Sequence, residues 1–389
     1  MHHVSQNRKS RFCFHRSHVS LSLALLLVLN SVRAHSAFAE TKTAPASTVS
    51  PAPALAPTPT SVPVEKNITF VDPNANIPKV PDNCELLSRG PGVALQDSEV
   101  TLHSFLEKVI ADLQQDKFEH LSEYFHPRAK VKSDLGEKIR SIIMNRYNAP
   151  LQYSIFRVWR VTSPSASKQI LENCPESDGA KIITSFGYAK QFAVWIQIMG
   201  QNELGRLILS VAPDKGKVSI VGFRIQQWTQ SGEDWRTWAG KAEAAEAKKD
   251  PKQAYLAYDI SQKLLDGKDF VTYPIQPALI KKRDEMFSQT KLVEAVNKDI
   301  GITTTAYVGT LLAKEGSGMF LREYIAKELP TSMLRDMCAS RGHTLQKTGW
   351  LNQSQGLRCN YIFKGMDPLH DSGLGGFYIT ADDLKPTKK

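Results

Sequence analysis

The sequence predicts an α+β fold, in which helices pack on a curved antiparallel sheet and are followed by a helical hairpin and a small C-terminal α+β module. Two observations carry this prediction. Apolar residues between 99 and 147 recur at three- and four-residue spacing, as they do in amphipathic helices. From residue 153 to 228 the period changes to two and turn residues separate the runs, as they do in antiparallel strands. Helices in one stretch and strands in the next are typical of α+β domains.

Residues 1–39 have the three parts of a secretory signal peptide. Basic residues precede an apolar run over 19–32, and Ala37-Phe38-Ala39 supplies a cleavage pattern that would leave Glu40 first. The run is short for a membrane span, which takes about 20 apolar residues, so a retained anchor is the weaker alternative. We therefore expect an exported chain, periplasmic or extracellular, with no integral membrane span after cleavage.

Cleavage also changes the charge balance. The whole chain has 49 basic and 39 acidic residues, a formal charge of +10, and removal of 1–39 leaves 44 basic residues against 39 acidic ones, or +5. No basic stripe is present, which argues against nucleic-acid binding. Residues 40–66 are rich in Pro, Ala and Thr and have few large apolar side chains, so we predict a disordered linker there.

A cone-like α+β domain is predicted over 67–230. Its first part, 67–91, contains several prolines and is expected to be irregular. Apolar faces predict helices over 99–113, 118–125 and 134–147. Alternation predicts strands over 153–161, 204–211 and 218–228, and a long β-rich run over 182–199 that Gly187 interrupts.

The order of these elements resembles the nuclear-transport-factor-two-like cone fold over about residues 95–230. The resemblance implies a hydrophobic cone, which holds a small ligand in some members, is catalytic in others and mediates protein contacts in many. A ligand pocket needs a few polar groups in an apolar wall. The candidates of these types are Tyr124, His126, Arg157, Trp159, Trp195 and Gln197. Ordinary strand packing of the last four is the alternative.

Residues 231–300 are predicted to form a helical hairpin and a connecting helix. Two helices over 235–268 are joined at Lys249-Asp250-Pro251. The positions that define the pattern are Trp235, Trp238, Ala242, Ala254, Tyr258 and Ser261. This spacing is similar to a tetratricopeptide repeat, but a solenoid with a peptide groove takes about three copies and only one is present. A connecting helix is expected over 278–298.

The C-terminal module is predicted over 301–389. A strand is expected over 303–313, a helix over 319–341, and two shorter strands over 358–364 and 376–380.

Four cysteines remain after cleavage, and an even number in an oxidising compartment suggests disulfides. Their spacing favours the pairs Cys84–Cys174 and Cys338–Cys359 among the three connectivities. Cys338 and Cys359 with His343 and His370 are also residue types that zinc accepts, but their spacing and the compartment favour a disulfide. No hydrolase, metalloprotease or nucleotide-binding motif occurs, so no catalytic residue, metal or cofactor is predicted.

The sequence therefore predicts a non-enzymatic envelope protein that binds a partner protein or a cell-wall component. A small-molecule-binding or catalytic cone-domain protein is the alternative.

Overall fold

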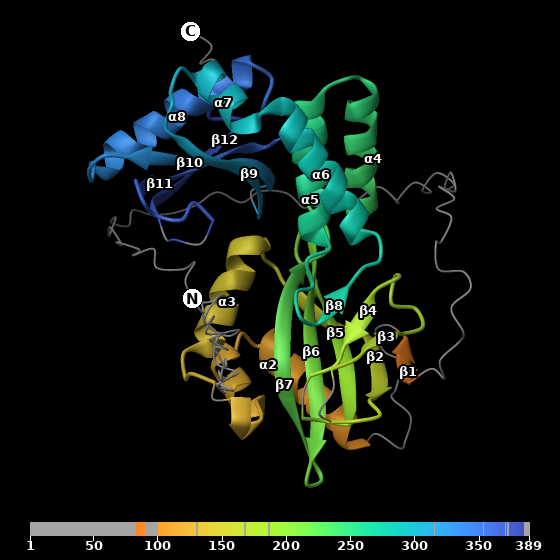
Figure 1. Ribbon diagram of the computed structural model, residues 1–389. Helices are drawn as coiled ribbons and strands as arrows, with labels where there is room; N and C mark the ends of the chain where they lie inside the picture. Colours follow the sequence, from red (N-terminus) through yellow and green to blue (C-terminus); the bar gives the residue numbers. More distant parts are fainter. Residues whose placement is uncertain are drawn as a thin grey trace, which may run out of the picture. The chain divides into compact units, whose positions relative to one another are not determined.

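The computed structural model describes residues 83–89, 100–129, 131–166, 169–185, 187–314, 316–352, 354–369, 371 and 373–384. The predicted signal peptide and linker lie outside these residues. Helices and mainly antiparallel sheets confirm the α+β class (Figure 1). In the part of the chain that the structure describes, none of the helices has the length and apolar character needed to cross a membrane.

The first sheet has five antiparallel strands in the order β1-β2-β5-β6-β7. Their bounds are Cys84–Arg89, Gln152–Thr162, Lys190–Met199, Leu204–Asp214 and Lys217–Gln227. The expectation of irregular structure up to residue 91 is wrong for β1, which pairs with β2. Alternation fails to reveal β1 because Leu87 and Ser88 are both buried, next to a register shift between Leu86 and Ser88.

Three helical segments cover one face of this sheet. They are α2 (Val100–Gln114), the 3₁₀ helix η2 (Phe118–Tyr124) and α3 (Leu135–Arg146). Leu106, Val109 and Ile143 of the helices form one apolar cluster with Val194 and Ile196 of β5. Because alternate residues of a strand point to opposite faces, Val194 and Ile196 place the helix-bearing face on the even positions of β5.

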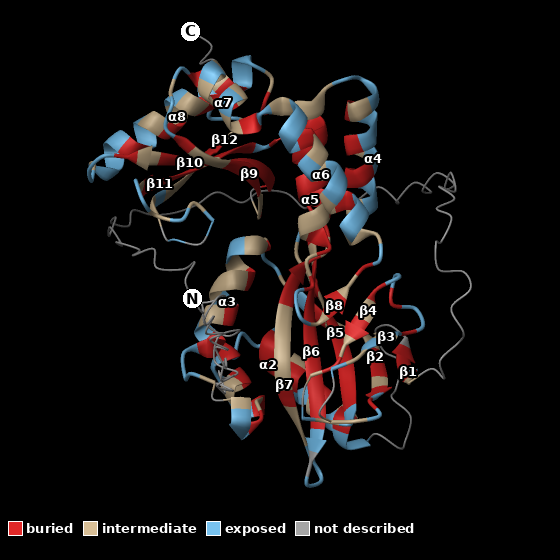
Figure 2. Ribbon diagram, viewed as in Figure 1, coloured by how far each residue is buried: buried red, intermediate tan, exposed pale blue. Residues whose placement is uncertain are grey.

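The opposite face is covered as well. The β-rich run predicted over 182–199 divides on either side of Gly187 into β4 (Lys181–Ile183) and β5, and these two strands belong to different sheets. Gly187, at φ +91°, lies in the turn between them. β4 pairs with β3 (Leu171–Asn173) and β8 (Val271–Thr272). Strands β5 and β6 are therefore buried almost along their whole length (Figure 2).

The predicted hairpin forms as α4 (Trp235–Ala247) and α5 (Pro251–Leu264). Each helix has an aspartate cap: Asp234 accepts a hydrogen bond from the Thr237 N–H, and Asp250 accepts one from the Gln253 N–H. Such caps satisfy amide groups that have no partner within the helix.

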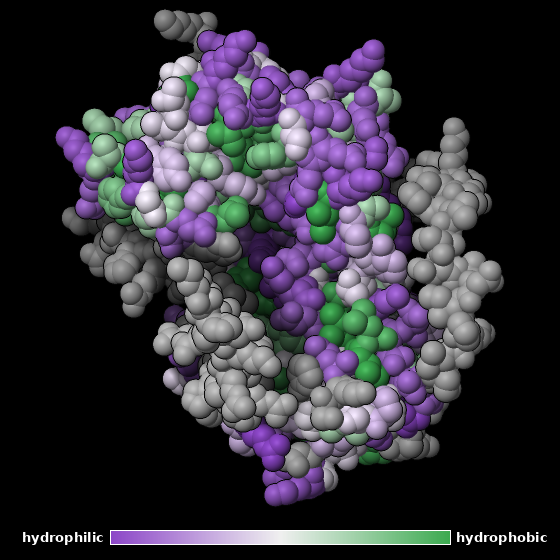
Figure 3. All heavy atoms as spheres, viewed as in Figure 1, coloured by the Kyte–Doolittle hydropathy of each residue, from purple (hydrophilic) through white to green (hydrophobic). Residues whose placement is uncertain are grey.

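Helices α6 (Gln276–Thr290) and α7 (Leu292–Ile300) follow the hairpin, and α6 packs on α5. The predicted single helix over 278–298 is interrupted at Lys291, whose φ of +43° is left-handed. On the face that Figure 3 shows, the region of α4 to α6 is mostly hydrophilic.

The C-terminal module has a four-stranded sheet in the order β12-β11-β10-β9. The bounds are β9 Thr305–Ala313, β10 Gly316–Ile325, β11 Gly356–Phe363 and β12 Leu374–Thr380, with α8 (Thr331–Lys347) between β10 and β11. The prediction of a helix over 319–341 is wrong at its start, since residues 316–325 form β10. Met319, Leu321 and Ile325 are the buried set, which is a period of two.

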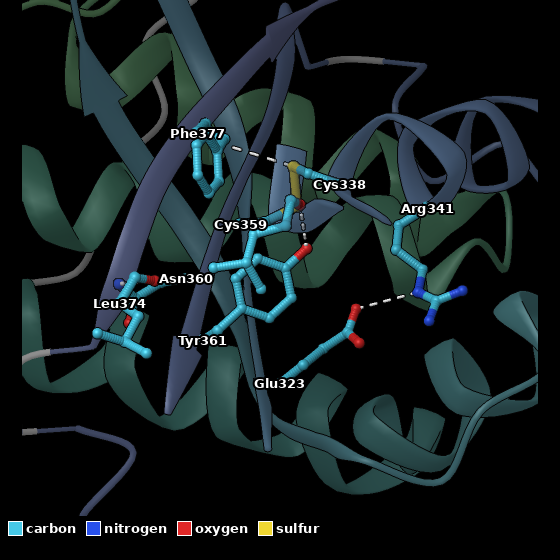
Figure 4. Close-up of a disulfide and its surroundings, with 9 residues drawn as sticks. Glu323, Cys338, Arg341, Cys359, Asn360, Tyr361, Leu374 and Phe377 are labelled. Atoms are coloured by element: carbon cyan, nitrogen blue, oxygen red, sulfur yellow. Dashed lines mark hydrogen bonds and ion pairs between the residues drawn. A yellow bond between two sulfur atoms is a disulfide. The ribbon is translucent and has the colours of Figure 1, made fainter. Parts of the chain in front are cut away.

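Both predicted disulfides are present, Cys84–Cys174 and Cys338–Cys359. The second joins α8 to β11 (Figure 4). Beside it the buried Glu323 pairs with Arg341 at 3.1 Å, and the Tyr361 hydroxyl donates to the Leu334 carbonyl at 2.9 Å.

Removal of the Cys338–Cys359 bridge is expected to destabilise the protein. Replacing both cysteines with serine should lower the free energy of unfolding by about 3 kcal/mol, the chain-entropy value for a loop of this length. Denaturant unfolding with and without reductant measures this. An unchanged midpoint, or four free thiols in peptide mapping of the native protein, would contradict the assignment.

Side chains of α5 cover the outer edge of β9. The Asp259 carboxylate accepts hydrogen bonds from the Thr310 N–H at 2.9 Å and from its hydroxyl at 2.6 Å. Lys263 donates to the Thr310 carbonyl at 2.6 Å, and the Tyr255 hydroxyl donates to the Val308 carbonyl at 3.1 Å. An edge strand has unpaired backbone groups, and here the hairpin supplies their partners.

A single apolar cluster connects distant parts of the chain. It includes Cys84 in β1, Trp195 in β5, Trp238 in α4, Cys338 in α8 and Leu384. The sheet, the hairpin and the C-terminal module therefore share one core.

Candidate ligand-binding site

The six predicted ligand residues divide between the two faces of the five-stranded sheet. Tyr124 belongs to the apolar cluster under the helices, and His126 follows it in the chain. Trp159 and Trp195 belong to the cluster on the other face. Arg157 pairs in register with Trp195, and so lies on that second face.

Gln197 also lies on the second face. It is two residues beyond Trp195 in β5 and opposite Arg206 of β6 in the register. The structure thus brings four of the six candidates to one face and leaves the other two apart from them.

On the helical side, Tyr124 is held by a buried carboxylate. Its hydroxyl donates to Asp112, and His120 Nδ1 lies 3.2 Å from the same carboxylate oxygen. Burial favours a higher pKa for Asp112, but the contacts with Tyr124 and His120 outweigh it and leave the pKa below its ordinary value. Sequence reasoning missed Asp112, although an acidic residue between Val109 and Leu113 on the apolar face of a helix is a usable signal.

His126 lies in the wall of an open hollow of about 310 Å³. The hollow is lined by His126, Arg128, Gly187, Tyr188, Ala189, Lys190 and Pro213. Two backbone contacts fix His126: its N–H donates to the Ile220 carbonyl at 2.9 Å, and Nδ1 accepts from the Arg128 N–H at 3.1 Å. Because Nδ1 accepts, the neutral ring carries its proton on Nε2.

The chemistry of this hollow is cationic. Arg128 and Lys190 are exposed, and the lining contains no acidic side chain. The Tyr188 ring meets the His126 ring edge to face at 5.8 Å. An open hollow with two permanent cations, an imidazole and a phenol favours an anionic group.

On the second face, aromatic rings surround the buried Arg206. Its guanidinium carbon lies 3.2 Å from the ring centre of Trp228, 4.3 Å from that of Trp195 and 5.1 Å from that of Phe156. Arg157 lies over the same Phe156 ring at 4.3 Å. Burial lowers the pKa of Arg206. Such cation–π contacts are strongest where water is excluded.

Sequence reasoning missed Arg206 and Trp228. The available signal is a lone arginine among the apolar residues of β6, since an arginine is almost never fully buried unless it is paired. The enclosed cavity next to Trp195 has room for only about 10 Å³, which is about one water molecule. The aromatic rings therefore pack on Arg206 instead of enclosing a ligand-sized space.

Within the described residues, no group of three or more His, Cys, Asp or Glu side chains is placed to hold a metal ion. His370, one of the four residues weighed as zinc ligands, lies outside them. Comparisons of the chain with family models, curated proteins and solved structures find no significant match. The cone and tetratricopeptide resemblances therefore remain predictions.

Glu203 gives the fold a measurable pH dependence. The carboxylate is buried between β5 and β6, and burial raises its pKa from 4.5 to about 7 although it accepts a hydrogen bond from the Ser231 N–H. Since the unfolded chain loses this proton first, stability should fall by about 1 to 3 kcal/mol as pH rises from about 4.5 to 7.

Glu203→Gln keeps an acceptor for Ser231 and should remove this slope in denaturant unfolding followed across that pH range. Glu233→Gln, at a partly exposed neighbour that pairs with Lys241, is the matched control. Equal slopes in both variants would contradict the assignment.

Proposed function

We propose that the mature chain is an exported, non-enzymatic protein that binds an acidic component of the cell wall. The observation that carries this proposal is the hollow beside His126. Its lining contains the basic side chains of Arg128 and Lys190. Its volume, about 310 Å³, is in the range of sites for small molecules, and a sugar unit or short peptide stem is of this size.

Export is supported by the signal-like residues 1–39 and by the two disulfides, which persist in oxidising compartments. We expect the mature protein to begin at Glu40. N-terminal sequencing of the protein from the exporting cell measures this directly. An intact Met1 in the membrane fraction would contradict it.

Binding is tested by co-sedimentation of the mature protein with isolated peptidoglycan sacculi. Chitin, an uncharged glycan, is the control polymer. We expect sacculi alone to retain the protein, less so at high salt, because screening weakens contacts between exposed charges. Arg128→Ala and Lys190→Ala should each weaken retention about fivefold, a loss of about 1 kcal/mol.

Lys281→Ala is the matched control, since this lysine is exposed on α6, far along the chain from the hollow. Equal retention on chitin, or no effect of the Arg128 and Lys190 variants, would overturn the proposal. Retention by a purified acidic protein but not by sacculi would favour a partner protein as the ligand.

The small-molecule or catalytic alternative has one observation in its favour. The buried Asp112 carboxylate orients His120, whose side chain is 40% exposed. A carboxylate that orients an accessible histidine is an arrangement used for general base catalysis. Native mass spectrometry tests this alternative, and a bound small molecule that is lost in His120→Ala would favour it.

A further inference from the structure

The segment Cys174–Gly179 crosses the aromatic residues on the second face of the sheet and contacts them through three polar groups. The Pro175 carbonyl accepts a hydrogen bond from Trp159 Nε1 at 2.8 Å. Glu176 pairs with Arg157 at 3.6 Å, and Asp178 pairs with Arg206 at 2.6 Å. We call this segment the strap.

The strap is held at one end by the Cys84–Cys174 disulfide. Its backbone is left-handed at Glu176, Asp178 and Gly179, with φ of +55°, +55° and +76°. This conformation directs two carboxylates, two residues apart, at the two arginines. The side chains of Glu176 and Asp178 are 39% and 36% exposed, so water reaches the outer side of both pairs.

Buried N–H groups beneath the strap do not all have hydrogen-bond partners. Arg157 Nε and Trp195 Nε1 are buried and have no hydrogen-bond partner among the described residues, and Arg206 Nη1 has only the Tyr273 hydroxyl as a polar neighbour. The Arg206 side chain is only 4% exposed. Buried donors without partners, next to non-glycine residues held in left-handed backbone, are typical of ligand sites and switch regions.

We propose that the strap occupies a binding site for acidic peptides. The ligand is a partner segment with two carboxylates two residues apart, in the order Glu-x-Asp, preceded by a backbone carbonyl for Trp159. The strap fills this site in the unbound protein and lifts away between its two fixed ends, Cys174 and β4, when the partner binds. Because binding energy is spent on displacing the strap, the intact protein binds such peptides more weakly than a protein with a weakened strap.

The probe is a fluorescent synthetic peptide, Ala-Pro-Glu-Ser-Asp-Gly, which copies residues 174–179 with alanine for the cysteine. A second peptide, with Gln and Asn in place of Glu and Asp, lacks the charges. Fluorescence polarisation measures the Kd of each peptide for the mature protein with intact disulfides. The variant Glu176→Gln with Asp178→Asn weakens the strap, and Asp116→Asn, at an exposed pair with Arg140, is the matched control.

We expect the strap variant to bind the acidic peptide at least tenfold more tightly than the wild type and Asp116→Asn do. Adding Arg157→Gln to the strap variant should reverse most of this gain. Equal affinity for the two peptides, or no gain in a folded strap variant, would overturn the proposal.

If circular dichroism shows that the double variant is unfolded, the single variant Glu176→Gln is tested in its place. This side chain is partly exposed and lies 3.6 Å from Arg157, so the substitution disturbs the fold less. We expect this variant to bind the acidic peptide about threefold more tightly than the wild type, which would support the site. Unchanged affinity would overturn the proposal. Arg128→Ala and Lys190→Ala should leave peptide binding unchanged, which separates this site from the hollow beside His126.

Discussion

Asp259→Ala is expected to lower the free energy of unfolding by about 3 to 5 kcal/mol. The substitution breaks a buried network and leaves Lys263 and the backbone N–H of Thr310 without the carboxylate that they share. Removing one partner of a buried ion pair has effects of this size, because the other charge stays uncompensated. Denaturant unfolding of the mature protein measures the change.

The same carboxylate should make the fold sensitive to acid. Burial favours a higher pKa, but Lys263, Thr310 and Arg283 outweigh it and hold the pKa of Asp259 below its ordinary value. Its contribution is present above the pKa of the unfolded chain and is lost as pH falls through the folded value. Glu285→Ala is the control, since Glu285 is 43% exposed on α6 and pairs with the exposed Lys281. Similar effects of Asp259→Ala and Glu285→Ala would show that the network does not connect the hairpin to β9.

Tyr258→Ala is expected to cost about 3 to 5 kcal/mol, because the ring is buried in the hairpin and its loss leaves a cavity. The hydroxyl also loses its hydrogen bond to Glu246 at 3.0 Å. Ala254→Leu should cost about 1 to 3 kcal/mol through overpacking, since Ala254 is fully buried. Lys248→Ala, at an exposed position after α4, should be close to neutral.

The denaturation midpoints of these three variants check the packing of α4 on α5. The Ser261 hydroxyl, which donates to the Trp235 carbonyl at 2.8 Å, indicates how closely the two helices approach. Equal, negligible shifts for all three variants would show that the hairpin does not pack in this way.

The sequence predicted those helices and strands whose pattern of apolar and turn residues lies within a single segment. The α+β class, the α4–α5 hairpin and the β5–β6–β7 meander all follow from the period and the turn residues. The start of the predicted helix over 319–341 is β10 instead, because Met319, Leu321 and Glu323 are good helix formers and only pairing with β9 and β11 makes this segment a strand.

The candidate site was less predictable, because its contacts join residues far apart in the chain. Trp159 and Trp195 are visible as aromatic residues on strands, but nothing in their own segments indicates that Arg206 lies against Trp195. The pair of Arg206 and Asp178 depends on the path of the strap, which the disulfide to Cys84 constrains. His126 could be proposed from the sequence because it follows a predicted helix. Lys190 lines the same hollow, but only the folded structure brings the two residues together.

The shared core has a consequence for the order of events during biogenesis. Cys84 and Leu384 belong to one apolar cluster, so this core is complete only after the residues beyond the last strand have been synthesised. The chain therefore cannot complete its fold from the N-terminus onward as it emerges.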